Sequence, residues 1–462
     1  MTSSQRGKRR GGRFSHTLST LALAGAGVIA MNHPAQAQTA AQPASAATAP
    51  AAPTFASAAD SDPLALGWMQ GFPPAPDKII RFDLASNRFP VTRWTFSHVR
   101  QLMPTAAVWR GRGAPSALPH APRDIGQVPY TDANGQRHTF AEMLALTYTD
   151  GILVMHKGKV IYEKYFGALD DHTQHIAMSV TKSFVGTLAA MLAAEGKLDP
   201  SAPVTRYLPE MAGTAYGDAT VREVMDMTVG VKYSENYADP KAEIWDYSRA
   251  GGMIPRPADY AGPKDFYAFL KTLQKDGEHD TAFAYKTVNA ELLAWIVKRV
   301  SGQNLSTVLS ERIWQPMGAE QDAYFIVDSI GNESGGGGLN TALRDLARFG
   351  ETMRNDGRFN GRQIIPAAVV ADIRRGGDPA KFAKAGYATL PGWSYRNMWW
   401  VANDDHGAFE ARGIHGQAIY VDPKAQMTIV RYASHPIAAN GANDPVTLPA
   451  FRALAQELMK QQ

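Results

Sequence analysis

The chain has 462 residues, of which 45% are hydrophobic and 19% charged, as in ordinary soluble globular proteins. Residues 1–37 hold five basic residues and no acidic one, so removing their five charges from the formal net charge of +4 leaves −1. A nearly neutral mature chain argues against a nucleic-acid partner. The absence of cysteine excludes disulfides, thiolate zinc ligands and thiol catalysis.

The first 37 residues have the three parts of an export signal. A basic stretch runs to Arg13, an apolar stretch of 14 residues follows from Leu18 to Met31, and Ala35-Gln-Ala37 has the small-x-small pattern of a cleavage site. The apolar stretch is too short to span a bilayer, so we expect no membrane span after cleavage. Arg9-Arg10 leaves the secretory and twin-arginine routes open. An exported protein without disulfides fits a bacterial periplasm.

The predicted elements begin after a low-complexity stretch. Residues 38–60 are almost all Ala, Pro, Ser, Thr and Gln, which predicts a flexible linker, and the ordered fold is expected to start between Asp60 and Phe82. Residues 150–166 carry two β-rich runs around a Lys-Gly turn and predict a hairpin. The apolar run from Ser179 to Glu195, followed by a glycine, predicts a buried helix.

The middle and the C-terminal part of the chain differ in pattern. Residues 199–300 are mostly helical in periodicity, and a helix capped by Asn340 or Thr341 is expected after four glycines at 335–338. The remaining patterns predict three strands and a final helix, at residues 397–401, 417–421, 427–432 and 448–459.

Strands near both ends of the folded part bracket a helical middle, which predicts an α+β fold built on an antiparallel sheet. The expected sheet domain combines residues 61–182 with residues 340–462. The expected inserted domain, residues 183–339, is mostly helical.

One tetrapeptide carries most of the chemical information: Ser179-Val-Thr-Lys182, the only Ser-x-x-Lys in the sequence. If Ser179 opens the helix, Lys182 lies one turn further on the same face. Burial in an apolar wall lowers the pKa of a lysine, because desolvation disfavours the charged form. A neutral amine can then take the serine proton and make Ser179 a nucleophile. The spacing alone is weak evidence, since serine is also a common helix N-cap.

Tyr285 is a second candidate, and it lies just before an amphipathic helix whose apolar positions include Leu292 and Ile296. Near cationic amines, a tyrosine loses its proton below the usual pKa of about 10. It can then act as general base, and as general acid toward a leaving group. The alternative is a core aromatic residue with one hydrogen bond, which this segment alone favours.

Two loop segments are candidates for substrate contacts. Gly413-Ile-His-Gly-Gln417 leads into a strand, and a free N–H at this glycine-flanked edge would form an oxyanion hole with the N–H of Ser179. Tyr237 lies in a polar loop of the kind that often lines binding sites. The alternatives are an ordinary turn between strands and a surface tyrosine.

Other catalytic and cofactor motifs are missing from the sequence. The glycines at 335–338 are followed neither by Gly-Lys-Ser/Thr nor by a dinucleotide fingerprint. His172 and His175 belong to no His-Glu-x-x-His motif, and there is no Gly-x-Ser-x-Gly elbow. The sequence therefore implies neither a metal ion nor an organic cofactor.

Taken in order, these segments resemble the serine β-lactamase and penicillin-binding-protein superfamily. They are most similar to its esterase- and amidase-like branch, which includes the 6-aminohexanoate-dimer (nylon oligomer) hydrolases. The resemblance implies an antiparallel sheet with helices on both faces, a helical domain, and a site between them. It covers roughly residues 100–440, and its most telling stretches are 175–199, 219–230, 235–240, 336–345 and 413–417.

The resemblance also implies catalytic roles. Ser179 would accept the acyl group, Lys182 would keep it activated, and Tyr285 would shuttle the proton. Ile414, which follows the third motif of the family, would supply the second oxyanion N–H.

Tyr237 matches a loop tyrosine that closes over the substrate in the amidase-like branch, and His415 is the other candidate for substrate binding. Together these roles predict an exported serine hydrolase that cleaves a small-molecule carboxylic ester or simple amide through an acyl-enzyme.

Two departures from the superfamily pattern bear on the substrate. The second motif, usually Tyr/Ser-x-Asn, is Tyr285-Lys-Thr287, and the third, Lys-Thr/Ser-Gly in penicillin-active members, reads Ala411-Arg-Gly413. The lysine that helps to hold a β-lactam carboxylate is therefore missing, although Arg412 could partly substitute for it. A β-lactamase or DD-peptidase of the same fold stays an alternative, as does a non-catalytic recognition protein that uses the cleft for binding.

Overall fold

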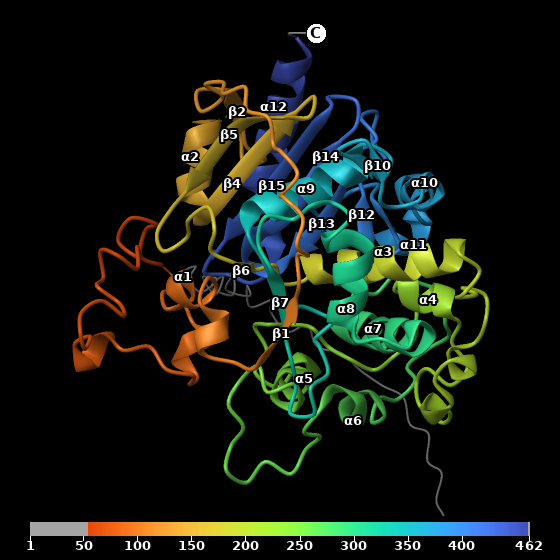
Figure 1. Cartoon of the computed structure of the whole chain (residues 1–462). Coiled ribbons are helices and arrows are strands. Elements are labelled where there is room, and N and C mark those ends of the chain that lie inside the picture. Colours follow the sequence, from red (N-terminus) through yellow and green to blue (C-terminus); the bar gives the residue numbers. More distant parts are fainter. Residues whose placement is uncertain (1–53, 461–462) are drawn as a thin grey trace, which may run out of the picture. The chain divides into compact units, whose positions relative to one another are not determined.

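The main sheet is built from two segments that lie far apart in the sequence. The computed structural model describes residues 54–460, so the predicted signal and most of the predicted linker lie outside the described residues. Seven strands follow the order β11-β12-β13-β14-β15-β4-β5, and all neighbouring pairs are antiparallel. Residues 149–165 thus pair with residues 394–433 (Figure 1). The predicted α+β fold is confirmed.

The strands form this main sheet, a four-stranded sheet of order β1-β7-β8-β6, and two short hairpins, β2-β3 and β9-β10. Their bounds are β1 Thr105–Val108, β2 Pro129–Thr131, β3 Arg137–Thr139, β4 Thr149–His156, β5 Lys159–Tyr165, β6 His175–Ile176, β7 Ala323–Ile326, β8 Leu339–Thr341, β9 Arg358–Phe359, β10 Arg362–Gln363, β11 Ser394–Arg396, β12 Trp399–Val401, β13 Phe409–Gly413, β14 Gln417–Asp422 and β15 Met427–Ala433.

The α-helices lie around the main sheet and in the middle of the chain. Their bounds are α1 Thr92–Thr95, α2 Phe140–Leu146, α3 Val180–Ala194, α4 Val221–Met225, α5 Glu243–Ala250, α6 Phe266–Leu270, α7 Thr287–Ser301, α8 Leu305–Leu309, α9 Leu343–Arg354, α10 Ala367–Arg375, α11 Pro379–Ala383 and α12 Asp444–Met459. Among residues 54–460, no helix combines the length and the apolarity that a membrane crossing requires.

Helices cover both faces of the main sheet, so its central strands are buried throughout. All eight positions of β4 are buried, and successive side chains alternate between two cores. Ile152 and Val154 pack into the core shared with α2 and α12, whereas Leu153 and Met155 pack into the core shared with α3 and α9. This continuous burial explains why β4 lacks the polar alternation of a half-exposed strand, whereas the edge strand β5 is partly exposed.

The segment between the two halves of the sheet carries α4 to α8, and α7 packs against α3. This segment also contains β7, which pairs with β1 from the N-terminal part of the chain. The division into a sheet domain of residues 61–182 and 340–462 and an inserted domain of residues 183–339 stays a prediction.

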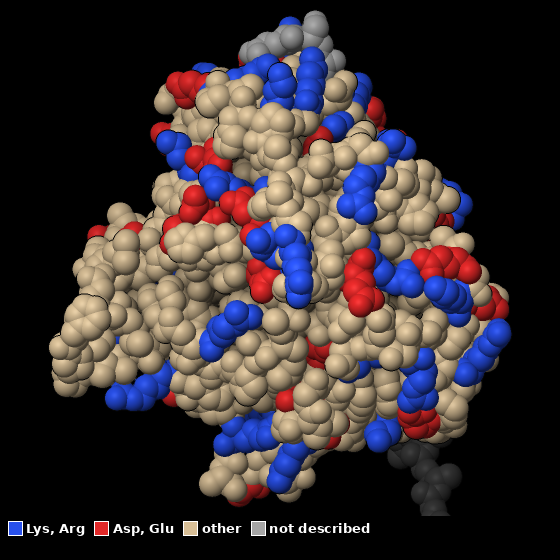
Figure 2. Space-filling view, in the orientation of Figure 1, with Lys and Arg blue, Asp and Glu red and all other residues tan. Residues whose placement is uncertain are grey.

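On the face shown in Figure 2, basic and acidic side chains are interspersed.

Most of the predicted elements that bear on the site occur where expected, and two expectations are wrong in detail. The hairpin and the helix after Ser179 are present, with Gly196 in the left-handed region just after α3. Asn340 and Thr341 do not cap a helix, because they pair in β8, and Ala342 precedes α9 instead. The ordered fold already includes Phe55, whose ring packs edge-on against Phe89.

Helix α3 is fixed against the main sheet at Gly186. A Cβ atom at this position would overlap the carbonyl oxygen of Asn397. Next to it, Ser183 Oγ donates to Met398 O at 2.7 Å, and Trp399 Nε1 donates to Thr187 Oγ1 at 3.1 Å. The start of α3, which carries Ser179, is therefore held at a set distance from β12.

We predict that Gly186→Ala lowers the free energy of unfolding by about 1–3 kcal/mol, because a methyl group there forces backbone atoms apart. The measurement is urea denaturation followed by circular dichroism. Gly113→Ala is the matched control, since a Cβ at Gly113 meets nothing within 4 Å, and its effect should stay within about 0.5 kcal/mol. Equal stability of the two variants would contradict the close contact.

Candidate active site

A cavity of about 630 Å³ lies at the start of α3, and most of its wall is apolar. Ser179, Tyr237, Ile414 and His415 all line it. Lys182 and Tyr285 contact Ser179 directly. The structure therefore brings together all six residues that the sequence singled out, although four of them belong to segments more than fifty residues from Ser179.

The hydroxyl of Ser179 interacts with Lys182 and not with the helix backbone. Ser179 is the N-cap residue of α3, yet its side chain makes no capping hydrogen bond. Lys182 Nζ lies 2.8 Å from Ser179 Oγ and donates to the carbonyl oxygen of Gly336 at 2.6 Å. A neutral amine satisfies both contacts, since it donates to Gly336 and offers its lone pair to the serine proton. This geometry disfavours the view that Ser179 is only a helix cap.

Burial sets the proton affinity of the amine. The Lys182 side chain is 1% exposed, and desolvation lowers its pKa from 10.5 to about 8. The carboxylates of Glu235 and Glu291 act in the opposite direction, because a nearby negative charge favours the ammonium form. A substantial fraction of Lys182 is therefore neutral in mildly alkaline solution.

Tyr285 also contacts this pair, but its predicted protonation is wrong. Its hydroxyl hydrogen-bonds with Ser179, and Lys182 Nζ lies 5.1 Å from its ring centroid. Burial raises the pKa of Tyr285 well above 10, and the charge of Glu235 adds to this effect. The hydrogen bond with Ser179 and the charge of Arg412 act in the opposite direction but are outweighed, and Lys286 Nζ is hydrogen-bonded to the Val231 carbonyl. Tyr285 is therefore a neutral phenol that can donate a proton.

Ser179 and Ile414, whose N–H groups are the predicted oxyanion donors, both line the cavity. Neither the N–H of Ser179 nor that of Ile414 donates to a carbonyl or side chain among residues 54–460. Each stands next to a residue in the left-handed region, Met178 with φ 47° and His415 with φ 63°. Such backbone is costly for non-glycine residues and is concentrated at functional sites.

Gly413 allows the end of β13 to lie against the turn before Ser179. A Cβ atom there would lie 2.7 Å from the carbonyl oxygen of Ala177 and 3.0 Å from Met178 Cβ. The glycine of the third motif is therefore required by the close contact between β13 and the turn that leads into α3.

The two predicted substrate-binding side chains are both held by hydrogen bonds. Tyr237 is half-buried, and its hydroxyl donates to Glu235 Oε1 at 2.9 Å. His415 Nδ1 lies 2.6 Å from the carbonyl oxygen of His435, and burial lowers the pKa of His415 to about 4. His415 is therefore a neutral, fixed part of the cavity wall.

Sequence reasoning missed several residues at the site. Glu235 lines the cavity and accepts from both the N–H and the hydroxyl of Thr287, at 2.6 and 2.7 Å. Phe55 and Phe89, from the segment that precedes β1, also line the cavity. Glu235 lies in residues 235–240, a stretch that resembles the family, but nothing in the sequence indicated a role for it. Phe55 and Phe89 belong to no motif, so no local signal indicated that they line the cavity.

Arg412 does not replace the missing lysine of the third motif. Its guanidinium is buried between the carboxylates of Glu410, at 3.1 Å, and Asp444. It also lies 5.5 Å from the ring centroid of Trp400, whose ring is 5.2 Å from that of Tyr285. Both carboxylates hold the pKa of Arg412 above its usual value despite burial. The cation is thus satisfied within the fold and is no part of the cavity wall.

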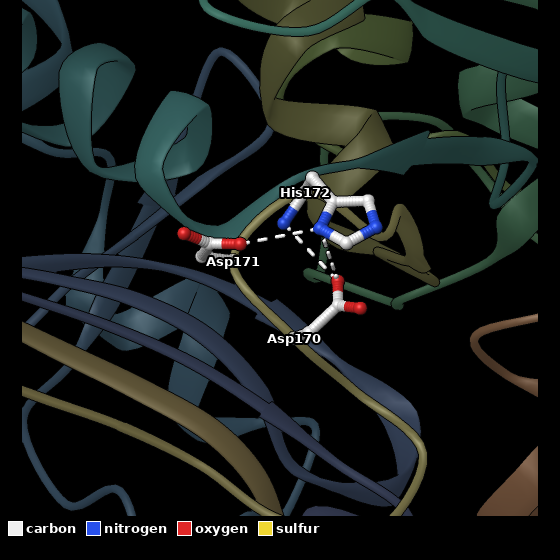
Figure 3. Close-up of side chains that lie close together, drawn as sticks. All are labelled: Asp170, Asp171 and His172. Atoms are coloured by element: carbon white, nitrogen blue, oxygen red, sulfur yellow. Dashed lines mark hydrogen bonds and ion pairs between the residues drawn. The ribbon is translucent and has the colours of Figure 1, made fainter.

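A group of potential metal ligands lies on the loop before β6. Asp170, Asp171 and His172 place ligand atoms within 4.8 Å of one another (Figure 3). Asp170 accepts the N–H groups of His172 and Thr173, and Asp171 forms an ion pair with Arg344 at 3.1 Å. These contacts explain why the three side chains lie close together as part of the loop structure, so their proximity alone does not indicate a metal site.

Comparison with known proteins decides the family. The family model described as Beta-lactamase matches residues 140–447. The chain belongs to this family. The 6-aminohexanoate-dimer hydrolase of Paenarthrobacter ureafaciens is 35% identical over 348 residues, which cover 75% of this chain and 86% of that protein.

Solved structures agree with this assignment. A Bacillus anthracis protein, provisionally assigned as a 6-aminohexanoate-dimer hydrolase, superposes with a TM-score of 0.77 at 30% identity, over 84% of this chain and 99% of the other. EstCE1, a hydrolase with promiscuous acyltransferase activity, shares the fold, with a TM-score of 0.51 and 19% identity over 68% of this chain and 98% of its own. The predicted resemblance and the prediction of an enzyme are confirmed: the chain is a serine hydrolase of the β-lactamase fold.

The site geometry predicts how the reactivity of Ser179 depends on pH. Only the neutral Lys182 amine can accept the serine proton, so the rate of labelling by an uncharged fluorophosphonate should rise with pH and level off above an inflection near 8. Stopped-flow fluorescence with a fluorophosphonate dye measures this profile, with Ser179→Ala as the unreactive control. An inflection near 10.5, the ordinary value for lysine, would contradict the desolvation of Lys182.

Proposed function

We propose that the protein hydrolyses carboxylic esters or linear amides through an acyl-enzyme formed on Ser179. The observation that carries this proposal is the contact of 2.8 Å between Ser179 Oγ and Lys182 Nζ inside a buried wall. A serine whose proton can pass to a buried amine of lowered pKa is an activated nucleophile.

In the first half of the reaction, neutral Lys182 takes the proton of Ser179 while Oγ attacks the carbonyl carbon. The N–H groups of Ser179 and Ile414 stabilise the negative charge on the carbonyl oxygen, an effect worth about 3–4 kcal/mol per donor. Tyr285 donates its proton to the leaving alcohol or amine and regains one from Lys182. The carbon–oxygen or carbon–nitrogen bond then breaks and leaves the acyl group on Ser179.

In the second half, water replaces the leaving group in the same position. Neutral Lys182 takes one proton from the water, passed on through the Tyr285 hydroxyl, as the water oxygen attacks the acyl carbon; the bond to Ser179 then breaks and this proton moves from Lys182 to Ser179 Oγ. The carboxylic acid leaves. The proton lost by Ser179 leaves with the alcohol or amine, and a proton from water restores the Ser179 hydroxyl, so the cycle closes without a cofactor.

Linear substrates fit the site better than β-lactams. The relative with 35% identity is named for hydrolysis of the 6-aminohexanoate dimer, a linear amide, and the cavity walls here are mostly apolar. The third motif offers no cation to a β-lactam carboxylate, because Ala411 stands at the lysine position and Arg412 is bound by Glu410 and Asp444. These features support an apolar acyl chain in the cavity.

We predict that Ser179→Ala abolishes hydrolysis of short p-nitrophenyl esters and of linear amides, with a loss of at least about 10³-fold in kcat/KM. Intact-mass spectrometry should also show a single fluorophosphonate adduct on the unmodified protein and none on the variant. Full activity of Ser179→Ala would overturn the acyl-enzyme mechanism. Hydrolysis or stable acylation by penicillin at a comparable rate would favour a β-lactamase or DD-peptidase instead.

We further propose that the protein is exported to a bacterial periplasm. The support is the sequence of residues 1–37, which lies outside the described residues. Cells that express the full chain should contain a mature form beginning near residue 38 in the periplasmic fraction, and a chain without residues 1–37 should stay in the cytoplasm. Mass spectrometry of each fraction measures this, and an uncleaved cytoplasmic chain would contradict export.

A further inference from the structure

A buried carboxylate that the proposed mechanism does not use lies close behind Lys182. Glu291 belongs to α7, and its side chain is 1% exposed. It accepts three hydrogen bonds, from the N–H groups of Gly335 at 3.2 Å and Gly336 at 3.1 Å, and from the hydroxyl of Tyr247 at 2.7 Å. A fully buried acid with three donors is part of a specific arrangement, because each of these groups would otherwise be left unpaired.

The arrangement connects Glu291 to the catalytic amine through one residue. Glu291 binds the N–H of Gly336, and the carbonyl oxygen of the same Gly336 accepts from Lys182 Nζ at 2.6 Å. The backbone of Gly336 therefore links the Glu291 carboxylate to the Lys182 amine.

The glycine loop has little freedom to move away from this position. A Cβ atom at Gly336 would lie 2.5 Å from Thr287 Cγ2 and 2.8 Å from Tyr247 Oη, and one at Gly335 would overlap Ala294 Cβ. The run of glycines thus permits close packing of the loop on α7, where the Glu291 carboxylate fixes its orientation.

We propose that Glu291 is a positioning residue for the catalytic base, which holds the 335–336 backbone so that the Gly336 carbonyl directs Lys182 Nζ toward Ser179. The inference rests on the proposed function, because it assigns Lys182 as the base. Without the carboxylate, the two N–H groups lose their acceptor and the carbonyl is free to turn, so the amine loses its fixed direction.

The charge of Glu291 adds a second, measurable effect. The groups that act on Lys182 are Glu235, Glu291 and the Tyr285 ring, and both carboxylates raise its pKa. Burial raises the pKa of Glu291 itself to about 7, and the charge of Asp328 adds to this rise. The hydrogen bonds from Tyr247, Gly335 and Gly336 act in the opposite direction. Tyr267 is a further titratable group whose pKa responds to the charge of Glu291. Since Lys182 has a pKa of about 8, Glu291 is mostly ionised when the amine loses its proton. Removing this charge should move the titration of Lys182 to lower pH.

The test is the pH profile of kcat/KM for an uncharged ester in the unmodified protein and in Glu291→Gln. The amide keeps the size of the carboxylate but carries no charge. We expect the limiting kcat/KM to fall on the order of tenfold or more. We also expect the inflection to move down by about one pH unit, the size expected for one nearby charge at an effective dielectric constant of about 20.

Asp345→Asn is the matched control. Asp345 is also fully buried and accepts two consecutive backbone N–H groups, those of Glu320 and Gln321, but neither of these residues binds Lys182, and Asp345 does not affect the pKa of Lys182. This variant should lose stability and keep the inflection of the unmodified protein. A Glu291→Gln protein that loses stability but keeps both the limiting rate and the inflection would overturn the inference.

A second variant covers the case in which Glu291→Gln does not fold. Tyr247→Phe removes one of the three donors to Glu291, so the limiting kcat/KM should fall severalfold; loss of this bond also raises the pKa of Glu291, so the inflection should move in the same direction as in Glu291→Gln, but by less. An unchanged rate in a folded Tyr247→Phe would then overturn the positioning role. Failure of the proposed function is recognised separately, because the unmodified protein would show no hydrolysis that depends on Ser179, and the inference would fall with it.

Discussion

The burial of Lys182 is the constraint on which the rest of the site depends. An ammonium group in an apolar wall loses hydration, which lowers the pKa of Lys182 to about 8. The remaining polar contacts of the amine are the Ser179 hydroxyl and the Gly336 carbonyl. Its lone pair is therefore available to the serine proton. Without this desolvation, Ser179 and Lys182 would form an ordinary hydrogen bond of no chemical consequence.

The fold supplies the wall in which the lysine is buried. Helix α3 lies between the main sheet and α7, so thirteen of its fifteen residues are buried. Three glycines allow the close contacts that this position requires: Gly186 against the Asn397 carbonyl, Gly413 against the turn before Ser179, and Gly336 against α7. The groups to which we assign catalytic roles are thus placed by backbone packing.

The electrostatics of the site explains the division of roles between Lys182 and Tyr285. Both are buried, but burial acts in opposite directions on the two groups, because it favours the neutral amine and the neutral phenol. The pKa of Lys182 falls and that of Tyr285 rises, with Glu235 opposing the first change and adding to the second. Lys182 is therefore suited to accept a proton and Tyr285 to donate one.

Much of this could be predicted from the sequence, where the signal was local or carried by ordered motifs. The hairpin, helix α3 and the residues Ser179, Lys182 and Tyr285 belong to this class. The strand at 339–341 was missed because its partners, β6 and β7, lie elsewhere in the chain, so no local pattern marks it.

The pKa of Tyr285 was expected to fall but is raised, and this was missed for a related reason. This pKa depends mainly on the burial of the hydroxyl and then on the charges near it, and tertiary packing sets both. Glu291, Tyr247 and the N-terminal residues Phe55 and Phe89 acquire their roles only through contacts between distant segments. The same holds for Arg412, whose partner Asp444 lies 32 residues away.

The most direct test of this account is an NMR titration of the protein with 13Cε-labelled lysine. The Lys182 resonance is identified by its absence from Lys182→Met, and its chemical shift is followed with pH. The account predicts a midpoint near 8, well below those of the exposed lysines. A midpoint near 10.5 would contradict it, because Lys182 would then stay charged at the pH at which it must accept the proton of Ser179.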